Sequence, residues 1–269
     1  MKHIDSRDNA QFKQLVRLVD GKDAGFGLVL EGIHLCRAWL RHVGRPMQAI
    51  FDAARLQTAP ELAELAADLP DRLCMSCAPR LARRLSQVEN GQGVYFVVKA
   101  PAPAVPEYID HNGLWLDRVQ DPGNLGTLLR TAAAAGIRHA YLSSGCASAW
   151  SQKTLRSAQG AHFVMAIHEQ LDLLAECGKL KVPLIAAALG QAQSLYSEPL
   201  PETCVWLLGN EGQGVDASLL QRADRRVFIP QTEGVESLNV AAAAAICLFE
   251  QRRQCLSRIQ RDRPNKSGG

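Results

Sequence analysis

The chain has 269 residues, of which 47% are hydrophobic and 21% charged, and its formal net charge is +3. This composition excludes a disordered chain, a collagen-like fibre and a small disulfide-stapled scaffold. No apolar run reaches the ~18–20 residues needed to span a bilayer, and the polar residues 1–8 lack a signal-peptide pattern. We therefore expect a cytoplasmic protein without membrane contact, whose eight cysteines are reduced thiols.

A metal or redox site is not expected. Cys74 and Cys77 form one C-x-x-C pair, but a structural zinc site needs a second pair at a suitable spacing. The seven histidines show no metal-ligand spacing. We predict that both cysteines are buried or half-exposed thiols.

The first hundred residues alternate short apolar runs with helical patterns. Strands are expected over 26–31, 49–52, 73–76 and 94–99, and helices over 9–19, 33–42, 60–68 and 79–86. We interpret residues 1–99 as a small α/β domain. Pro101, Pro103 and Pro106 then form a stiff, extended segment, because proline fits neither a helix interior nor a central strand. Residues 100–111 are therefore predicted to be a linker.

The second part of the chain continues this alternation with strands that are apolar on both faces. The expected strands are 114–118, 140–142, 163–167, 184–188, 205–208 and 227–229, and the clearest helices are 125–135 and 238–255. Such strands are typical of a mostly parallel sheet covered by helices on both faces. Gly136 follows the first of these helices, as expected for a C-terminal cap. We predict a second α/β domain over residues 112–255.

The net charge is distributed unevenly along the sequence. It is +3 over residues 1–99, −5 over 100–250 and +5 over 251–269. Residues 256–269 are accordingly expected to form a basic, flexible tail. Two interpretations of these charges stay open: a solvated helix end favoured by the helix dipole, and contact with nucleic-acid phosphates.

Three polar segments follow predicted strands of the second domain. They read D-P-G-N-L-G-T-L-L-R-T-A (121–132), L-L-G-N-E-G-Q-G (207–214) and I-P-Q-T-E-G-V-E-S-L-N-V (229–240). Ligands of open parallel sheets bind beyond the carboxyl ends of the strands, so these loops are expected to form one site. Folding alone could also account for single residues: Asn124 could cap one helix, and Ser237 or Asn239 another.

Together and in this order, the three segments resemble the signature motifs of the SpoU/TrmH branch of the SPOUT RNA methyltransferases. The resemblance covers about residues 112–250, and residues 6–35 are more loosely similar to the small substrate-binding domain that often precedes the catalytic domain. It implies a mostly parallel α/β catalytic domain with a trefoil knot, a rare exception to unknotted topology. It also implies S-adenosylmethionine as methyl donor, a ribose 2′-hydroxyl of structured RNA as acceptor, and a homodimer with active sites near the subunit interface.

The resemblance assigns roles position by position. The catalytic positions are matched by Asn124, Arg130, Glu211, Ser237 and Asn239. The cofactor-binding positions are matched by Leu208, Gly209, Asn210, Gly214, Ile229, Pro230, Ser237, Leu238 and Asn239. Contact with RNA is predicted for Arg130 and, in the first domain, for Arg80, Arg83 and Arg84 on one predicted helix, although an ordinary solvated helix face has the same pattern.

Arg130 is expected to be essential but not to be the proton acceptor, because a guanidinium stays protonated in proteins. We expect it to hold the phosphate of the target and to stabilise developing alkoxide charge. Two other functions stay open: a non-catalytic RNA-binding or ribosome-assembly factor on the same fold, and a base-methylating enzyme of the same superfamily. By analogy with relatives that carry an extra N-terminal domain, ribosomal RNA is favoured over transfer RNA.

Overall fold

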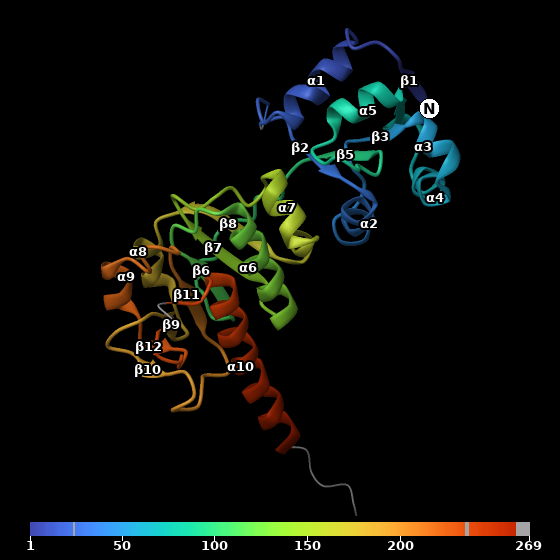
Figure 1. Cartoon of the computed structure of the whole chain (residues 1–269). Helices are drawn as coiled ribbons and strands as arrows, with labels where there is room; N and C mark the ends of the chain where they lie inside the picture. The colour runs from blue at the N-terminus through green and yellow to red at the C-terminus, as the bar shows by residue number, and fades with distance from the viewer. Residues whose placement is uncertain (24, 235–236, 262–269) are drawn as a thin grey trace, which may run out of the picture. The chain divides into compact units, whose positions relative to one another are not determined.

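The computed structural model describes residues 1–23, 25–234 and 237–261 (Figure 1). Most of the predicted tail, residues 262–269, lies outside the described residues, and so do Val235 and Glu236 of the third motif. The chain forms two compact units, which divide between Pro101 and Ala102. Among the described helices, none is both long and apolar enough to cross a bilayer.

The first unit contains a five-stranded mixed sheet in the order β1-β4-β3-β5-β2. Its strands are β1 (Lys2–Ile4), β2 (Leu28–Glu31), β3 (Gln48–Asp52), β4 (Cys74–Cys77) and β5 (Val94–Val98). Its helices are α1 (Ala10–Val19), α2 (Ile33–His42), α3 (Ala53–Thr58), α4 (Pro60–Ala67), α5 (Pro79–Leu85) and the 3₁₀ turn η1 (Asp71–Leu73). The sequence pattern does not predict β1, because only one of its three residues is buried. It is held by parallel pairing with β4.

The two cysteines of the C-x-x-C pair lie in β4 and are both buried. Burial raises the pKa of Cys77 to about 12, so its thiol stays protonated. All eight cysteines of the chain are free thiols. Among the described residues, no group of three or more His, Cys, Asp or Glu side chains could hold a metal ion.

The second unit contains a seven-stranded sheet in the order β10-β12-β9-β11-β6-β7-β8, and every neighbouring pair is parallel. Its strands are β6 (Gly113–Leu116), β7 (His139–Ser143), β8 (Ala166–Leu171), β9 (Leu184–Ala187), β10 (Gln193–Ser194), β11 (Val205–Leu208) and β12 (Arg225–Phe228). Its helices are α6 (Pro122–Ala135), α7 (Gln152–Ala158), α8 (Leu173–Glu176), α9 (Ala217–Arg222) and α10 (Val240–Arg261), with 3₁₀ turns η2 (Ala161–Val164) and η3 (Cys177–Lys179). The predicted α/β fold with a mostly parallel sheet is confirmed.

Both faces of this sheet are buried. Successive side chains of a strand point to opposite faces, so Leu114 and Leu116 of β6 pack on the side of α6 and α10, whereas Trp115 packs on the side of α8 and α9. In Figure 1, α6 and α10 lie side by side along one face of the sheet. Gly136 ends α6 in the left-handed conformation expected of a cap, with φ 98°.

Two predicted elements differ most from the structure. The strand expected over 163–167 begins only at Ala166, because Gly160 turns the chain in the left-handed conformation and residues 161–164 form η2. Helix α10 continues six residues beyond the expected Cys255 and ends at Arg261. Residues 256–261, expected to be flexible, are therefore helical, and Arg258 anchors this part by donating to the Leu200 carbonyl at 2.7 Å.

Candidate active site

Helix α6 follows β6, and its N-terminal cap is Asp121 rather than Asn124. Asp121 Oδ1 accepts a hydrogen bond from the backbone nitrogen of Asn124 at 2.8 Å, and Pro122 occupies the first turn. Lys153 Nζ lies 2.8 Å from Asp121 Oδ2. This contact and the hydrogen bond from Asn124 hold the pKa of Asp121 below its usual range. Because the cap is supplied by Asp121, the side chain of Asn124 is available for other partners.

Asn124 connects the three polar motifs through a chain of hydrogen bonds. Its Nδ2 donates to Glu211 Oε1 at 2.9 Å, and its Oδ1 accepts from Asn239 Nδ2 at 3.0 Å. Asn239 Oδ1 caps α10 by accepting from the backbone nitrogens of Ala241 and Ala242 at 2.9 and 3.3 Å. The structure therefore brings together Asn124, Glu211 and Asn239, three of the residues that the motifs single out.

A cavity of about 480 Å³ opens beside this chain, beyond the carboxyl ends of β9, β11 and β12. Most of the predicted cofactor-binding residues line it, namely Leu208, Gly209, Asn210, Gly214, Ile229, Ser237 and Leu238. Pro230 and Asn239 are described but do not line it. Further lining residues, which sequence reasoning missed, include Ala188, Leu189, Phe228, Gln231 and Ala243.

The loop after β11 has its shape because of one glycine. A Cβ atom at Gly209 would lie 2.2 Å from the backbone nitrogen of Val215 and 2.4 Å from the Gly214 carbonyl oxygen, so a side chain cannot be placed there without moving the backbone. The loop is closed by paired backbone hydrogen bonds between Asn210 and Gly214, at 2.9 and 3.1 Å. This tight turn forms one wall of the cavity.

Gln231 supplies an unused polar atom to the cavity wall. Its Oε1 is buried and has no hydrogen-bond partner among the residues that the structure describes. Buried acceptors are normally paired in proteins, so this oxygen is suited to accept from a ligand donor. Its position directly after Pro230 in the third motif is the signal that could have identified it from the sequence.

Arg130 does not share the environment of Asn124. It is exposed on α6 and makes no hydrogen bond or ion pair within the described part of the chain. Residues six apart in a helix differ by about 120° around the axis and by about 9 Å along it. Within one chain, Arg130 and Asn124 therefore lie on different sides of α6.

The three predicted RNA-binding arginines of the first unit lie on α5 and are exposed. Arg80 is paired with Asp5, and Arg84 with Asp20, each at 3.1 Å. Arg83 has no such partner among the described residues. Of the three, Arg83 is the one whose charge is not already compensated within the unit.

The second and third motifs line one cavity, and Asn124 of the first motif is hydrogen-bonded to both of them. Together with the parallel α/β sheet, this places the chain in the class of SpoU/TrmH-type RNA methyltransferases. The SpoU rRNA Methylase family matches residues 112–249, and the chain belongs to this family.

Two characterised relatives and one solved structure illustrate the similarity. The chain is 33% identical over 259 residues to the 23S rRNA (guanosine(2553)-2'-O)-methyltransferase RlmP of Bacillus subtilis, covering 94% of this chain and 100% of the relative. It is 32% identical to the 23S rRNA (guanosine-2'-O-)-methyltransferase RlmB of Bordetella pertussis, covering 84% of this chain and 97% of the relative. An AdoMet-bound rRNA methyltransferase from Sinorhizobium meliloti superposes with a TM-score of 0.81 at 26% identity, covering 94% of this chain and 97% of that chain.

Proposed function

We propose that this protein transfers a methyl group from S-adenosylmethionine to a ribose 2′-hydroxyl in ribosomal RNA. The observation that carries the proposal is the hydrogen-bonded chain Asn239–Asn124–Glu211 beside the cavity. Relatives whose names specify 2'-O-methylation of 23S rRNA favour ribose over base, and ribosomal over transfer RNA. The three linked polar groups also favour an enzyme over a non-catalytic assembly factor.

The residues around the cavity fit S-adenosylmethionine. The cofactor supplies a methyl group on a positively charged sulfur, which is already activated for transfer. The close turn at Gly209 leaves its backbone open to the cavity, and Ile229 and Leu238 provide apolar walls for the adenine and methionine parts. Gln231 Oε1 can accept from an amino group of the cofactor.

The protein has to align the ribose 2′-oxygen with the methyl group and to accept the proton of the 2′-hydroxyl. Asn124 is held by hydrogen bonds on both sides, so we propose that it orients the target ribose. Of the three hydrogen-bonded residues, Glu211 alone has an ionisable side chain. We therefore propose that its carboxylate accepts the proton of the 2′-hydroxyl. Arg130 would hold the phosphate of the target, as a guanidinium is suited to do, and Ser237 lies exposed at the cavity edge to contact the ribose.

We propose that the active form is a homodimer. Helix α10 exposes a row of large apolar side chains, Phe249, Leu256 and Ile259, each between 45% and 56% exposed. Their spacing of seven and three residues places them on one side of the helix, where a second copy could cover them. A second copy would also allow its Arg130 to reach the site at Asn124. The variant Phe249→Glu with Leu256→Glu should then be monomeric in light scattering, and a dimeric double variant would exclude this interface.

The proposal includes three further features. A trefoil knot is proposed because the chain belongs to the SpoU rRNA Methylase family, as the resemblance of the motifs implies. A cytoplasmic location agrees with a ribosomal RNA substrate. Contact with RNA is proposed for Arg83, with Arg80 and Arg84, and for the basic end of the chain.

The test is methyl transfer from labelled S-adenosylmethionine into ribosomal RNA from cells that lack this protein, followed by mapping of the modified nucleotide. We expect one 2′-O-methyl site, absent with Asn124→Ala. Methylation of a base would identify a base methyltransferase. Absence of S-adenosylmethionine binding by calorimetry, with and without RNA, would identify the non-catalytic factor.

A further inference from the structure

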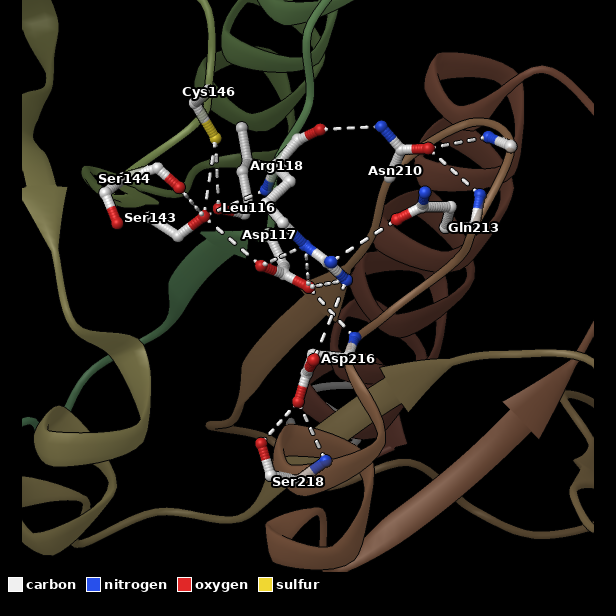
Figure 2. Close-up of polar contacts among 11 residues, drawn as sticks. Leu116, Asp117, Arg118, Ser143, Ser144, Cys146, Asn210, Gln213, Asp216 and Ser218 are labelled. Carbon is white, nitrogen blue, oxygen red and sulfur yellow. Dashed lines mark hydrogen bonds and ion pairs between the residues drawn. The ribbon is translucent and has the colours of Figure 1, made fainter.

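The loop 209–216 has two sides. One side lines the cavity, through Gly209, Asn210 and Gln213 among others. The other side contacts the two residues that follow β6, Asp117 and Arg118, which lie outside the three motifs (Figure 2). The cavity wall is therefore supported from behind by a neighbouring strand end.

Arg118 has an unusual backbone conformation. Its φ is 54°, in the left-handed region that non-glycine residues rarely adopt. Ser143 Oγ accepts from the Arg118 backbone nitrogen at 2.9 Å and donates to Asp117 Oδ1 at 3.2 Å. The Arg118 carbonyl is thereby directed to Asn210 Nδ2, which donates to it at 2.9 Å. A strained residue whose backbone groups are all in use is typical of a functional constraint.

The contact with Asn210 determines the shape of the loop. With its Nδ2 bound to Arg118, Asn210 presents Oδ1 to the backbone nitrogens of Gly212 and Gln213, both at 2.9 Å. Glu211 lies within this turn, and its Oε1 accepts the hydrogen bond from Asn124 Nδ2. The conformation of Arg118 is therefore transmitted to the carboxylate of the proposed active site.

The side chains of Asp117 and Arg118 hold the far end of the same loop. Asp117 is 3% exposed, and its Oδ2 accepts from the backbone nitrogen of Asp216 at 2.9 Å and from Arg118 Nη2 at 3.1 Å. Arg118 Nη1 also reaches Gln213 Oε1 at 3.4 Å. A buried carboxylate needs such charged and polar partners, so the two side chains and the loop stabilise one another.

We propose that Asp117 and Arg118 form a clamp that positions loop 209–216 for cofactor binding and for methyl transfer, and that both are positioning residues. The inference rests on the proposed function, because it takes the cavity to be the S-adenosylmethionine site. A purely structural role would lower the stability of the unit. The clamp predicts, in addition, a specific change at the loop and in cofactor affinity.

The first test uses Arg118→Gly, which accepts a positive φ and keeps the carbonyl but removes the guanidinium. The hydrogen bond to Gln213 is lost, and so are those to Asp117, which holds the Asp216 amide. We therefore expect the Kd for S-adenosylmethionine to rise roughly tenfold or more. The KM for the cofactor should rise and kcat fall, while the KM for RNA stays near wild type. The melting temperature should also fall, because buried Asp117 loses its charged partner. Arg118→Lys keeps a charge beside Asp117 and should recover part of the affinity.

The matched control is Arg225→Ala. Arg225 is similarly half-buried and ion-paired, with Glu198 at 3.1 Å, but it lies at the amino end of β12, away from the cavity. The Arg225→Ala variant should bind S-adenosylmethionine with the affinity of wild type. An Arg118→Gly protein with wild-type cofactor affinity overturns the clamp.

The second test is hydrogen exchange without cofactor. Arg118→Gly and Asp117→Asn should both speed exchange at the amides of Gly212, Gln213 and Asp216 and leave the β6 amides protected. Because both residues act through one loop, the double variant should exchange little faster than Asp117→Asn alone. Unchanged loop exchange in both single variants overturns the clamp, even if wild type binds no S-adenosylmethionine. Failure of wild type to bind the cofactor overturns only the proposed function.

Discussion

The side chain of Asn239 determines which way the amide of Asn124 faces. Asn239 Oδ1 is occupied by two backbone nitrogens of α10, so only its Nδ2 can be turned toward Asn124. Asn124 must then present Oδ1 to Asn239 and Nδ2 to Glu211. The cap of α10 thus sets the direction of every hydrogen bond in this chain, and Glu211 is left as an acceptor with one carboxylate oxygen engaged.

The first prediction separates two roles of Asn239, which caps α10 and orients the amide of Asn124. Asn239→Asp keeps a cap acceptor but places a second acceptor against Asn124 Oδ1, so the chain should break while α10 stays capped. We expect a melting temperature near wild type and a kcat lowered about 100-fold, a size seen when a preorganised polar group is lost. Steady-state methyl transfer and thermal unfolding measure the two effects.

Asn239→Ala is the comparison, because it removes both the cap and the donor. It should lose about 1 kcal/mol of stability through the missing cap, in addition to the activity. If Asn239→Asp turned over at the wild-type rate, the orientation of Asn124 would have no part in catalysis.

The second prediction concerns Arg130. Lysine keeps the charge but lacks the planar fork that binds a phosphate in two places, so Arg130→Lys should lower kcat with RNA about tenfold or more. Its Kd for S-adenosylmethionine should not change, because Arg130 does not line the cavity. Arg138→Lys, on an exposed arginine that donates to the Ala133 carbonyl, is the control and should behave like wild type. Retention of wild-type kcat by Arg130→Lys would remove Arg130 from the essential set.

Local sequence patterns predicted the architecture well where an element is long or apolar on both faces. Strand β11 and helix α2 begin and end where the pattern places them. Short elements were missed, such as β1, which pairs with a strand far away in the sequence. The end of α10 was missed because it depends on the tertiary contact between Arg258 and Leu200.

The composition of the site was predictable, but the contacts were not. The motifs place Asn124, Glu211 and Asn239 at the carboxyl ends of strands, and the sheet brings them together. Their pairing depends on Asp121 supplying the cap of α6, which frees the side chain of Asn124. The role of Arg118 could not be read from the sequence, because its positive φ is imposed by Ser143, 25 residues away.

The third prediction tests the close turn at Gly209. Gly209→Ala would place a Cβ atom 2.2 Å from the Val215 nitrogen, so the loop must move and the cavity wall with it. We expect a loss of about 1–3 kcal/mol in stability, as for an overpacked site, and cofactor binding too weak for calorimetry. Gly178→Ala is the control, because nothing lies within 4 Å of its added Cβ. Wild-type cofactor affinity in Gly209→Ala would show that this turn does not shape the site.

The fourth prediction is a loss of stability in mild acid. His162 is 1% exposed, and its Nε2 donates to the Ala149 carbonyl at 2.6 Å. Burial lowers its pKa from 6.5 to about 4, so the folded protein keeps this ring neutral where the unfolded chain protonates it. The unfolded state then binds more protons, and the free energy of unfolding falls as the pH falls from about 6.5 toward 4, by about 1 kcal/mol per pH unit. Above pH 7 both states are neutral and the effect vanishes.

The variant His162→Gln isolates this contribution. Glutamine can still donate to Ala149 but does not titrate. The free energy of unfolding of the variant should therefore fall less steeply toward pH 5 than that of wild type. At pH 7.5 it should be lower than that of wild type. Denaturant unfolding at several pH values measures the slope, and His34→Gln, on an exposed histidine, is the control. Burial also lowers the pKa of His139 to about 4, so part of the acid sensitivity should persist in His162→Gln. An unchanged slope in this variant would show that His162 is not held neutral in the folded protein.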